Sequence, residues 1–232
     1  MTSFARLARY PRVLFAALRA RRRIRAAGAL SPEEAAAFVR DCRWYRDTLR
    51  ATQSPEEIVW LLDKLRRDPP RTVLEIGMDQ GGTLFLWTRV AADDALLVAV
   101  DNRPLGALGK YSPFAIVRRG LARSRQKVKL VMPADSHDPA TLARVGRALE
   151  DRPVDFLFID ADHSYDAVKR DYEMYSPLVR PGGVVGFHDV APLHFEGVAR
   201  FWAELKATEE TDEIVGSEGL RYGIGVVRVK AR

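Results

Sequence analysis

The sequence is poor in cysteine: Cys42 is the only one among 232 residues. One cysteine cannot form an internal disulfide, and Cys42 lacks a second thiol for a metal-binding motif. These absences exclude a fold held together by disulfides and a site built on paired cysteines. We expect Cys42 to be a small buried side chain. Internal repeats and low-complexity tracts are also absent.

Long apolar runs are missing as well. The longest early stretch, Val13 to Leu18, is far shorter than the roughly 20 residues that a membrane span needs, and it is shorter than the core of a signal peptide. We therefore expect a cytoplasmic protein.

Acidic residues are absent from the first 30 positions, which carry eight arginines. Removing these eight from the 37 lysines and arginines leaves 29 against 31 acidic residues, so the rest of the chain is nearly neutral. This distribution disfavours a nucleic-acid substrate, because proteins that act on nucleic acids more often spread basic residues around the active face. Three interpretations of the basic segment stay open: a peripheral contact with anionic lipid, a helix packed on a neighbouring subunit of a homo-oligomer, or a solvated extension.

Residues 1–52 are expected to form a basic, helical N-terminal extension to one domain that spans 53–232. The apolar spacing of the first segment is roughly helical, although Pro11 is expected to interrupt it. The runs that start at Ser31 and Ser54 both read Ser-Pro-Glu-Glu, which is typical of a helix start.

From residue 72 onward, short apolar runs alternate with longer helical stretches. This rhythm predicts an α/β fold with a doubly wound, Rossmann-like parallel sheet. Residues 103–127 are expected to include an ordered insertion near the site. The expected strands are Thr72–Ile76, Leu96–Val100, Val128–Met132, Val154–Ile159, Val184–Phe187 and Tyr222–Val229, with a weak one near Ile214, and the expected helices are Thr83–Ala92, Pro139–Leu149, Tyr165–Leu178 and Glu196–Lys206.

A glycine-rich turn follows the first expected strand and leads into a helix. Asp79 stands where a dinucleotide-binding loop needs its second glycine, and the Lys-Ser/Thr pair of a phosphate-binding P-loop is missing. Glu75 beside this loop would repel a pyrophosphate but suits a cationic ligand such as S-adenosylmethionine, which carries an ammonium and a sulfonium. The residues expected to bind this cofactor here are Glu75, Gly77, Gly81, Gly82 and Thr83.

Acidic residues also follow the second and third expected strands. Asp101 lies 24 residues after Gly77, where an acid binds ribose hydroxyls in doubly wound folds. Asp135 or Ser136 is a candidate to bind the adenine amine, although both residue types are also common in plain turns.

The densest polar cluster follows the fourth and fifth expected strands. Asp160, Asp162 and His163 end one strand, and His188 and Asp189 end the next, so the sheet should bring them to one rim. Histidine titrates near neutral pH, which makes His163 or His188 a candidate general base. A structural role that only fixes the loop is the alternative for each histidine.

On the segments Glu75 to Thr83, Ile159 to Val168 and Pro181 to Asp189, the chain resembles the class I S-adenosylmethionine-dependent methyltransferases. Within them it is similar to the small-molecule O-methyltransferase group that includes macrocin O-methyltransferase-like and cephalosporin hydroxylase-like proteins and methyltransferase family 24. The resemblance covers about residues 53–229. It implies a seven-stranded sheet whose last strand, Gly223 to Val229, is antiparallel.

The resemblance also implies a metal site. In relatives that use a divalent ion, one acid after the fourth strand and a pair after the fifth bind it, and Asp160 and Asp189 fall on two of these positions. His188 replaces the usual acid at the third, which weakens the case for Mg²⁺ and admits Mn²⁺ or no metal. Asp160 is thus a candidate for cofactor binding, catalysis and metal binding.

We therefore expect methyl transfer from S-adenosylmethionine to a small molecule, at a hydroxyl of a sugar, glycolipid or secondary metabolite. The alternatives are N-methylation, a non-catalytic binding module that keeps the fold, and a hydroxylase whose two histidines and carboxylate hold iron. The residues suggested to face the acceptor are Tyr111, Phe114, His194 and Phe195.

Overall fold

The computed structural model describes residues 3–41, 49, 51–103, 113–217 and 221–230, without the side chains of residues 3–13, 113 and 114. The predictions for Cys42 and Tyr111, and that for the Phe114 side chain, lie outside this description. No helix in the described part of the chain is long and apolar enough to cross a membrane.

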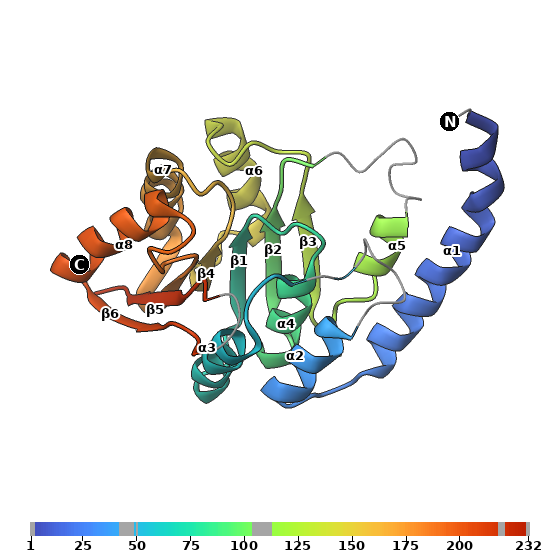
Figure 1. Ribbon diagram of the computed structural model, residues 1–232, viewed down its shortest axis with the longest axis horizontal. Coiled ribbons are helices and arrows are strands. Elements are labelled where there is room, and N and C mark those ends of the chain that lie inside the picture. Colours follow the sequence, from blue (N-terminus) through green and yellow to red (C-terminus); the bar gives the residue numbers. More distant parts are fainter. Residues whose placement is uncertain (1–2, 42–48, 50, 104–112, 218–220, 231–232) are drawn as a thin grey trace.

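One seven-stranded sheet forms the centre of the protein, with the strand order β3-β2-β1-β4-β5-β7-β6 (Figure 1). The five strands from β3 to β5 pair in parallel, and β7 is antiparallel to both of its neighbours. The expected Rossmann-like sheet and its antiparallel last strand are therefore confirmed. The strands are β1 Thr72–Ile76, β2 Leu96–Val100, β3 Lys127–Val131, β4 Val154–Ile159, β5 Val179–His188, β6 Glu210–Ile214 and β7 Ile224–Arg228.

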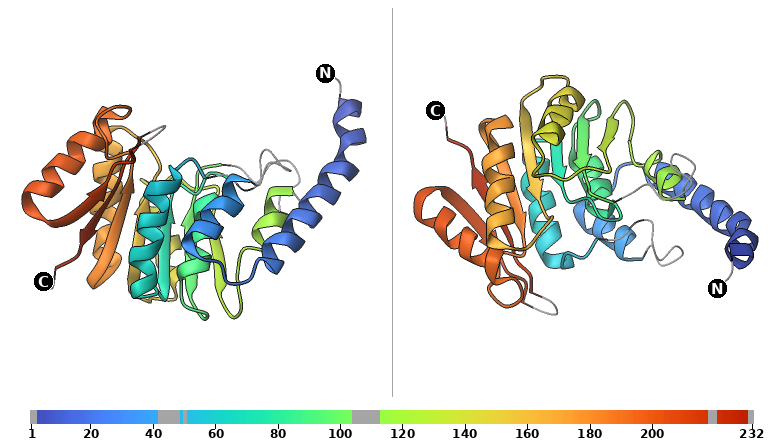
Figure 2. Two further views of the ribbon diagram at one scale, coloured as in Figure 1. Left: turned by 60° about the horizontal axis from the view of Figure 1, so that its bottom comes forward. Right: turned by 90° about the horizontal axis from the view of Figure 1, so that it is seen from above.

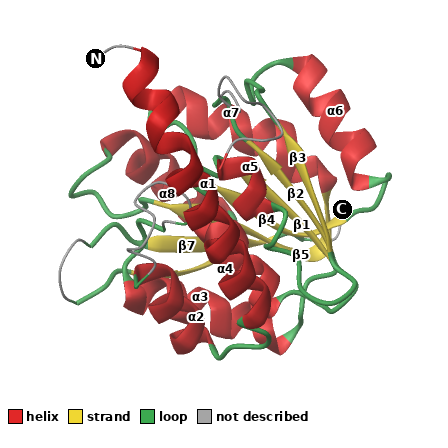
Figure 3. Ribbon diagram, turned by 90° about the vertical axis from the view of Figure 1, so that its right-hand side faces the viewer, coloured by secondary structure: helices red, strands yellow, loops and turns green. Residues whose placement is uncertain are grey.

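Helices cover both faces of the sheet (Figure 3). One apolar core lies between the sheet and helices α1 to α5, with Leu61, Leu62 and Trp87 at its centre. The other lies between the sheet and helices α6 to α8, around Val168 and Trp202. Every residue of β1 and β2 is buried, which explains their continuous apolar runs. The helices are α1 Ser3–Ala26, α2 Pro32–Arg40, α3 Pro55–Arg67, α4 Gly82–Val90, α5 Pro113–Arg118, α6 Pro139–Leu149, α7 Tyr165–Tyr175 and α8 Glu196–Thr208, and a short 3₁₀ helix covers Ser176–Leu178.

The helix starts follow the sequence signals closely. Ser31 caps α2 through a reciprocal pair of hydrogen bonds with Glu34, and Ser54 stands at the cap position of α3 without such a bond. The expected break at Pro11 is wrong, because α1 continues through it. A proline removes one helical hydrogen bond and crowds the preceding turn, but neighbouring turns can carry the helix past it.

The segment before residue 53 packs into the apolar core between the sheet and helices α1 to α5. Ala35 and Val39 of α2 are buried together with residues of α3 and α4, and Ala17, Ala20 and Ile24 attach the second half of α1. The structure therefore packs this extension onto the same face of the sheet as α4.

Glu75 lies inside this core and does not face the ligand cleft described below. Its side chain is fully buried, and its carboxyl oxygen accepts a hydrogen bond of 2.9 Å from the Trp87 indole nitrogen. Burial raises the pKa of Glu75 to about 8. Glu75 is therefore not part of the cavity walls, and its side chain contacts α4 through Trp87. Its contact with a cationic ligand stays a prediction.

Glu75→Gln is expected to make the stability of the protein less dependent on pH. The folded pKa of Glu75 lies above the value of 4.5 for an ordinary glutamate, so its stabilising contribution is present at low pH and is lost as the pH rises toward 8. The uncharged amide can still accept the bond from Trp87. Melting temperatures measured from pH 5 to 9 should fall with pH less steeply in the variant, and parallel curves would contradict this account.

Candidate active site

Two adjoining cavities open at the carboxyl edge of the parallel strands, where doubly wound folds bind their ligands. The first, of about 310 Å³, lies over the ends of β1, β2, β3 and β4, and the second, of about 330 Å³, extends toward β5. They share Gly77, Asp79, Arg103, Asp160 and Ala161 along their common wall. We call the first the nucleoside cavity and the second the acceptor cavity, after the roles that we propose for them below.

The first glycine of the loop after β1 has a packing role that the sequence analysis did not predict. Gly77 has φ +86°, and a Cβ added to it would overlap the backbone of Asp160 and Ala161. The missing side chain therefore lets two loops of the protein touch each other. Gly81, with φ +80°, and Gly82 start α4 and do not line either cavity, whereas Thr83 lines the acceptor cavity. The direct ligand contact predicted for Gly81 and Gly82 is therefore not found in the cavity walls.

Asp101 is held rigidly at the end of β2. Its carboxylate accepts backbone hydrogen bonds of 2.8 Å from Asp79 and from Arg103. Arg103 in turn forms an ion pair with the Asp79 side chain. Asp101 lines the nucleoside cavity, and its binding to ribose hydroxyls stays a prediction.

Asp135 and Ser136 line the same cavity, and α7 anchors their loop. The Tyr175 hydroxyl donates a hydrogen bond of 2.7 Å to the Ser136 carbonyl oxygen. Asp171, fully buried, lies 3.3 Å from the His137 imidazole, and burial raises its pKa to about 6. The sequence interpretation missed this anchor, although a carboxylate three residues after Val168 on an apolar helix face is a signal of it.

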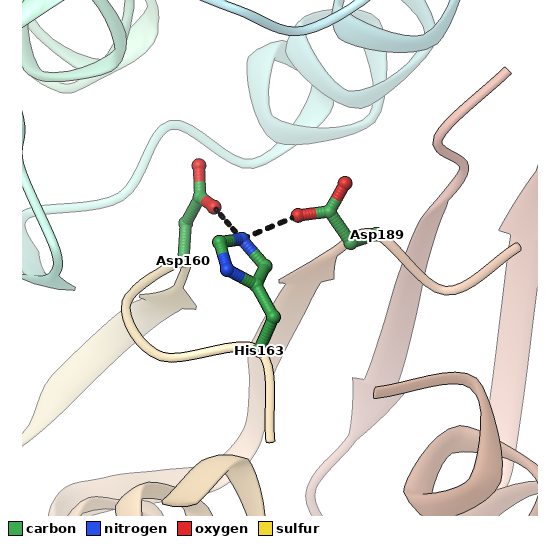
Figure 4. A group of neighbouring side chains, drawn as sticks. All are labelled: Asp160, His163 and Asp189. Carbon is green, nitrogen blue, oxygen red and sulfur yellow. Dashed lines mark ion pairs between the residues drawn. The ribbon is translucent and has the colours of Figure 1, made fainter. Parts of the chain in front are cut away.

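Asp160, His163 and Asp189 converge in the wall of the acceptor cavity (Figure 4). His163 Nε2 lies 2.8 Å from Asp189 Oδ2 and 3.9 Å from Asp160 Oδ1. His188 joins the same two acids from another side: its Nδ1 is 3.1 Å from Asp189 and 3.4 Å from Asp160. Four of the five side chains predicted to meet at one rim are therefore found together, whereas the fifth, Asp162, lines the nucleoside cavity and accepts a hydrogen bond from the Ser164 amide.

The two histidines differ in exposure and in charge. Burial disfavours a charged His188, but Asp160 and Asp189 outweigh it and raise its pKa to about 10. The hydrogen bond to Asp189 raises the pKa of His163, whose side chain is 37% exposed. The same two histidines keep the pKa of Asp189 below its ordinary value despite its burial. His188 is therefore a buried cation that balances the acids, and His163 is the histidine that a ligand can reach.

A divalent metal fits part of this cluster. Asp160, His163 and Asp189 each offer a ligand atom, and these atoms lie within 4.8 Å of one another. The predicted set named His188 in place of His163. The group of neighbouring ligand atoms contains His163, whereas the choice of His188 stays a prediction, since His188 Nδ1 also faces the two acids. One imidazole and two carboxylates suit Mn²⁺ better than Mg²⁺.

Three further residues of the acceptor cavity come from outside the sequence motifs. Gln53 donates a hydrogen bond of 2.7 Å to Asp160 Oδ2. Phe195 stacks on His163 with a ring-centroid distance of 4.1 Å, and Tyr222 stacks on Phe195. Phe195 was expected near the acceptor. Gln53 and Tyr222 were missed, because they lie far from the motifs and nothing local in the sequence marks them.

His194 was also suggested to face the acceptor. The structure instead packs its ring against Tyr222, at a centroid distance of 4.9 Å, and His194 is not part of the cavity wall.

The strand order and the parallel pairing of five strands define the class as a Rossmann-like α/β fold. The methyltransferase domain family matches residues 74–190, which are 117 of the 232 residues. The chain therefore belongs to the methyltransferase domain family. The uncharacterized protein y4gI of Sinorhizobium fredii is 31% identical over 153 residues, which cover 64% of this chain but only 16% of that protein. The chain thus spans about a sixth of the length of this relative.

Solved structures share the fold. The O-methyltransferase TomG from Streptomyces achromogenes, in complex with SAM, is 22% identical with a TM-score of 0.57 over 87% of this chain and 91% of that one. An O-methyltransferase from Bacillus cereus, in complex with SAH, is 21% identical with a TM-score of 0.56 over 84% and 90%. The mycinamycin-pathway methyltransferase MycE, in complex with Mg and SAH, is 15% identical with a TM-score of 0.55 over 87% and 55%. At these identities the likeness concerns the fold alone.

Gly77→Ala is expected to destabilise the protein by several kcal/mol, because the new Cβ meets backbone and the positive φ disfavours a side chain. Gly146→Ala is the matched control. Gly146 lies within α6 with no atom near its would-be Cβ, and alanine there should stabilise the helix by about 0.5–1 kcal/mol. Urea unfolding measures both, and equal stabilities of the Gly77 variant and the wild type would refute the argument.

Proposed function

We propose that the protein transfers a methyl group from S-adenosylmethionine to a hydroxyl of a small molecule. The observation that carries this proposal is the shared wall of the two cavities, which places a nucleoside-sized site directly beside an acid-histidine cluster. Family membership supports the reaction class, and the residues of each cavity support the division of roles.

The nucleoside cavity suits the adenosyl group. Asp101 presents a carboxylate at the end of β2, where ribose hydroxyls are bound in this kind of fold. Asp135 and Ser136 offer oxygen acceptors for an adenine amine on the opposite wall. Asp79 and Asp160 add negative charge at the common wall, which favours a cationic ligand.

The acceptor cavity suits the proton chemistry of a hydroxyl. S-adenosylmethionine supplies a methyl group on a positively charged sulfur when it is bound, and displacement at this carbon needs an aligned oxygen nucleophile. Asp189 accepts a hydrogen bond from Nε2 of neutral His163, which leaves Nδ1 with the lone pair that takes the hydroxyl proton. Stacking on Phe195 holds the ring in this orientation.

A metal-assisted form of the same reaction rests on the convergence of Asp160, His163 and Asp189. A divalent cation held by these residues would lower the pKa of the acceptor hydroxyl. His163 then serves as a ligand and not as the base, so the two forms exclude each other.

The chemical class of the acceptor is the finer part of the proposal. The aromatic rings of Phe195 and Tyr222 form one wall of the acceptor cavity, and flat or ring-shaped molecules pack well against such rings. A sugar or a ring-containing secondary metabolite fits this wall. A nitrogen nucleophile is the alternative, and it would depend less on His163.

Asp101→Asn is expected to weaken S-adenosylmethionine binding at least tenfold, because charge-assisted hydrogen bonds to hydroxyls are about twice as strong as neutral ones. Calorimetric titration with S-adenosylmethionine, S-adenosylhomocysteine and NADH measures this, with Asp63→Asn as a control on the exposed face of α3. Absence of binding to the wild-type protein, or preference for NADH, would overturn the proposed cofactor.

His163→Ala is expected to lower kcat by about 10²- to 10⁴-fold while S-adenosylmethionine binding persists. In the wild type, activity should rise with pH through the His163 pKa, which lies above the ordinary 6.5, because the base must be unprotonated. Formation of S-adenosylhomocysteine over a panel of hydroxylated acceptors is the readout.

The same assay separates the two forms of the mechanism. Activity that survives EDTA supports His163 as the base, and activity lost to EDTA and restored by Mn²⁺ supports the metal-assisted form. Unchanged activity of His163→Ala would contradict both.

A further inference from the structure

Helix α1 lies at the edge of the protein, and only part of it packs against the rest of the domain. Its second half packs against α5, and its first half extends beyond the body of the domain (Figures 1 and 2). Ala17, Ala20 and Ile24 form the docked side, with at most 4% of each residue exposed. The opposite side of this half faces solvent.

The solvent side of α1 carries large apolar groups. Phe15 is 64% exposed and Leu18 is 43% exposed, although burying such side chains is normally favourable by about 1.5–3 kcal/mol each. They are three residues apart, so they lie next to each other on one face of the helix. Nothing in the described part of the domain covers them.

Arginines surround these two side chains. Arg19 and Arg22 follow Phe15 by four and seven residues, and Arg25 follows Leu18 by seven, so all three lie on or beside the same face and all are exposed. The whole of α1 contains eight arginines and no acidic residue. We call the set Phe15, Leu18, Arg19, Arg22 and Arg25 the outer face of α1.

We propose that the outer face of α1 rests on a membrane surface that contains anionic phospholipids. Phenylalanine and leucine insert at the boundary of headgroups and acyl chains, and arginines beside them reach the lipid phosphates. This is a contact in the plane of the surface, since α1 is too polar to cross a bilayer.

The charge of α1 disfavours two other occupants. A second copy of the helix would bring arginines against arginines, which costs free energy in the absence of acids on α1. A nucleic acid would pair with the arginines but would leave Phe15 and Leu18 without an apolar partner. The proposal does not depend on the methyl-transfer reaction.

Co-sedimentation of the full chain with phosphatidylcholine vesicles, with and without a quarter of phosphatidylglycerol, tests the proposal. We expect binding to the anionic vesicles that weakens with salt and little binding to the neutral ones. Combined Arg19→Gln, Arg22→Gln and Arg25→Gln should weaken binding about a hundredfold, and combined Phe15→Ser and Leu18→Ser about tenfold or more.

The first matched control is Leu193→Ser, which removes an apolar side chain that lies elsewhere on the surface and is 61% exposed. The second is Arg147→Gln on the exposed side of α6. Both should bind vesicles like the wild type, and unchanged melting temperatures show that every variant is folded. Equal binding to both vesicle types, or no loss in either outer-face variant, overturns the proposal.

Two further outcomes would identify a partner other than a membrane for the outer face of α1. Conversion of a dimer to a monomer by the Phe15 and Leu18 changes would identify a second copy as the partner. Tighter binding to duplex DNA than to anionic vesicles, unaffected by these two changes, would identify a nucleic acid.

Discussion

The close approach of two loops at Gly77 is the constraint on which the cleft depends. The Gly77 amide donates to the Val100 carbonyl at 3.0 Å, and the Asp160 amide donates to the Ile76 carbonyl at 2.9 Å, so the sheet pattern continues past the ends of the strands. With no Cβ between them, the loops after β1 and β4 form one wall that serves both cavities. Any side chain at position 77 would meet the backbone of Asp160 and Ala161 and force the two loops apart.

The balance of charge within that cluster follows from its burial. Asp189 is only 2% exposed, and a buried carboxylate is costly unless charges and hydrogen bonds compensate it. His188 supplies a buried positive charge against both acids, and His163 supplies a second imidazole that solvent can reach. Because position 188 holds a histidine in place of the expected acid, the site carries less negative charge. His163 is a third metal-ligand candidate beside Asp160 and Asp189.

The sequence predicted the strands better than the directions of side chains. The bounds of β1, β2 and β4 agree with the structure, because strands buried on both faces appear as unbroken apolar runs between polar turns. The direction of the Glu75 side chain could not be predicted for a different reason: a run that is buried on both faces carries no alternation to show which way a polar residue points. Gln53 was missed because its partner, Asp160, lies 107 residues away.

The residues that line the two cavities lie partly inside and partly outside the region that matches the methyltransferase domain family. Gly77, Asp101, Asp160 and Asp189 all lie within residues 74–190, the region matched by the methyltransferase domain family. Gln53, Phe195 and Tyr222, which also line the acceptor cavity, all lie outside it. Membership in the family therefore bears on the nucleoside side and on the acid-histidine cluster, whereas in the proposed function the side chains from segments that flank the matched region would contribute to the choice of acceptor. Relatives that share this region but differ at these three positions should consequently differ in their acceptors more than in their affinity for S-adenosylmethionine.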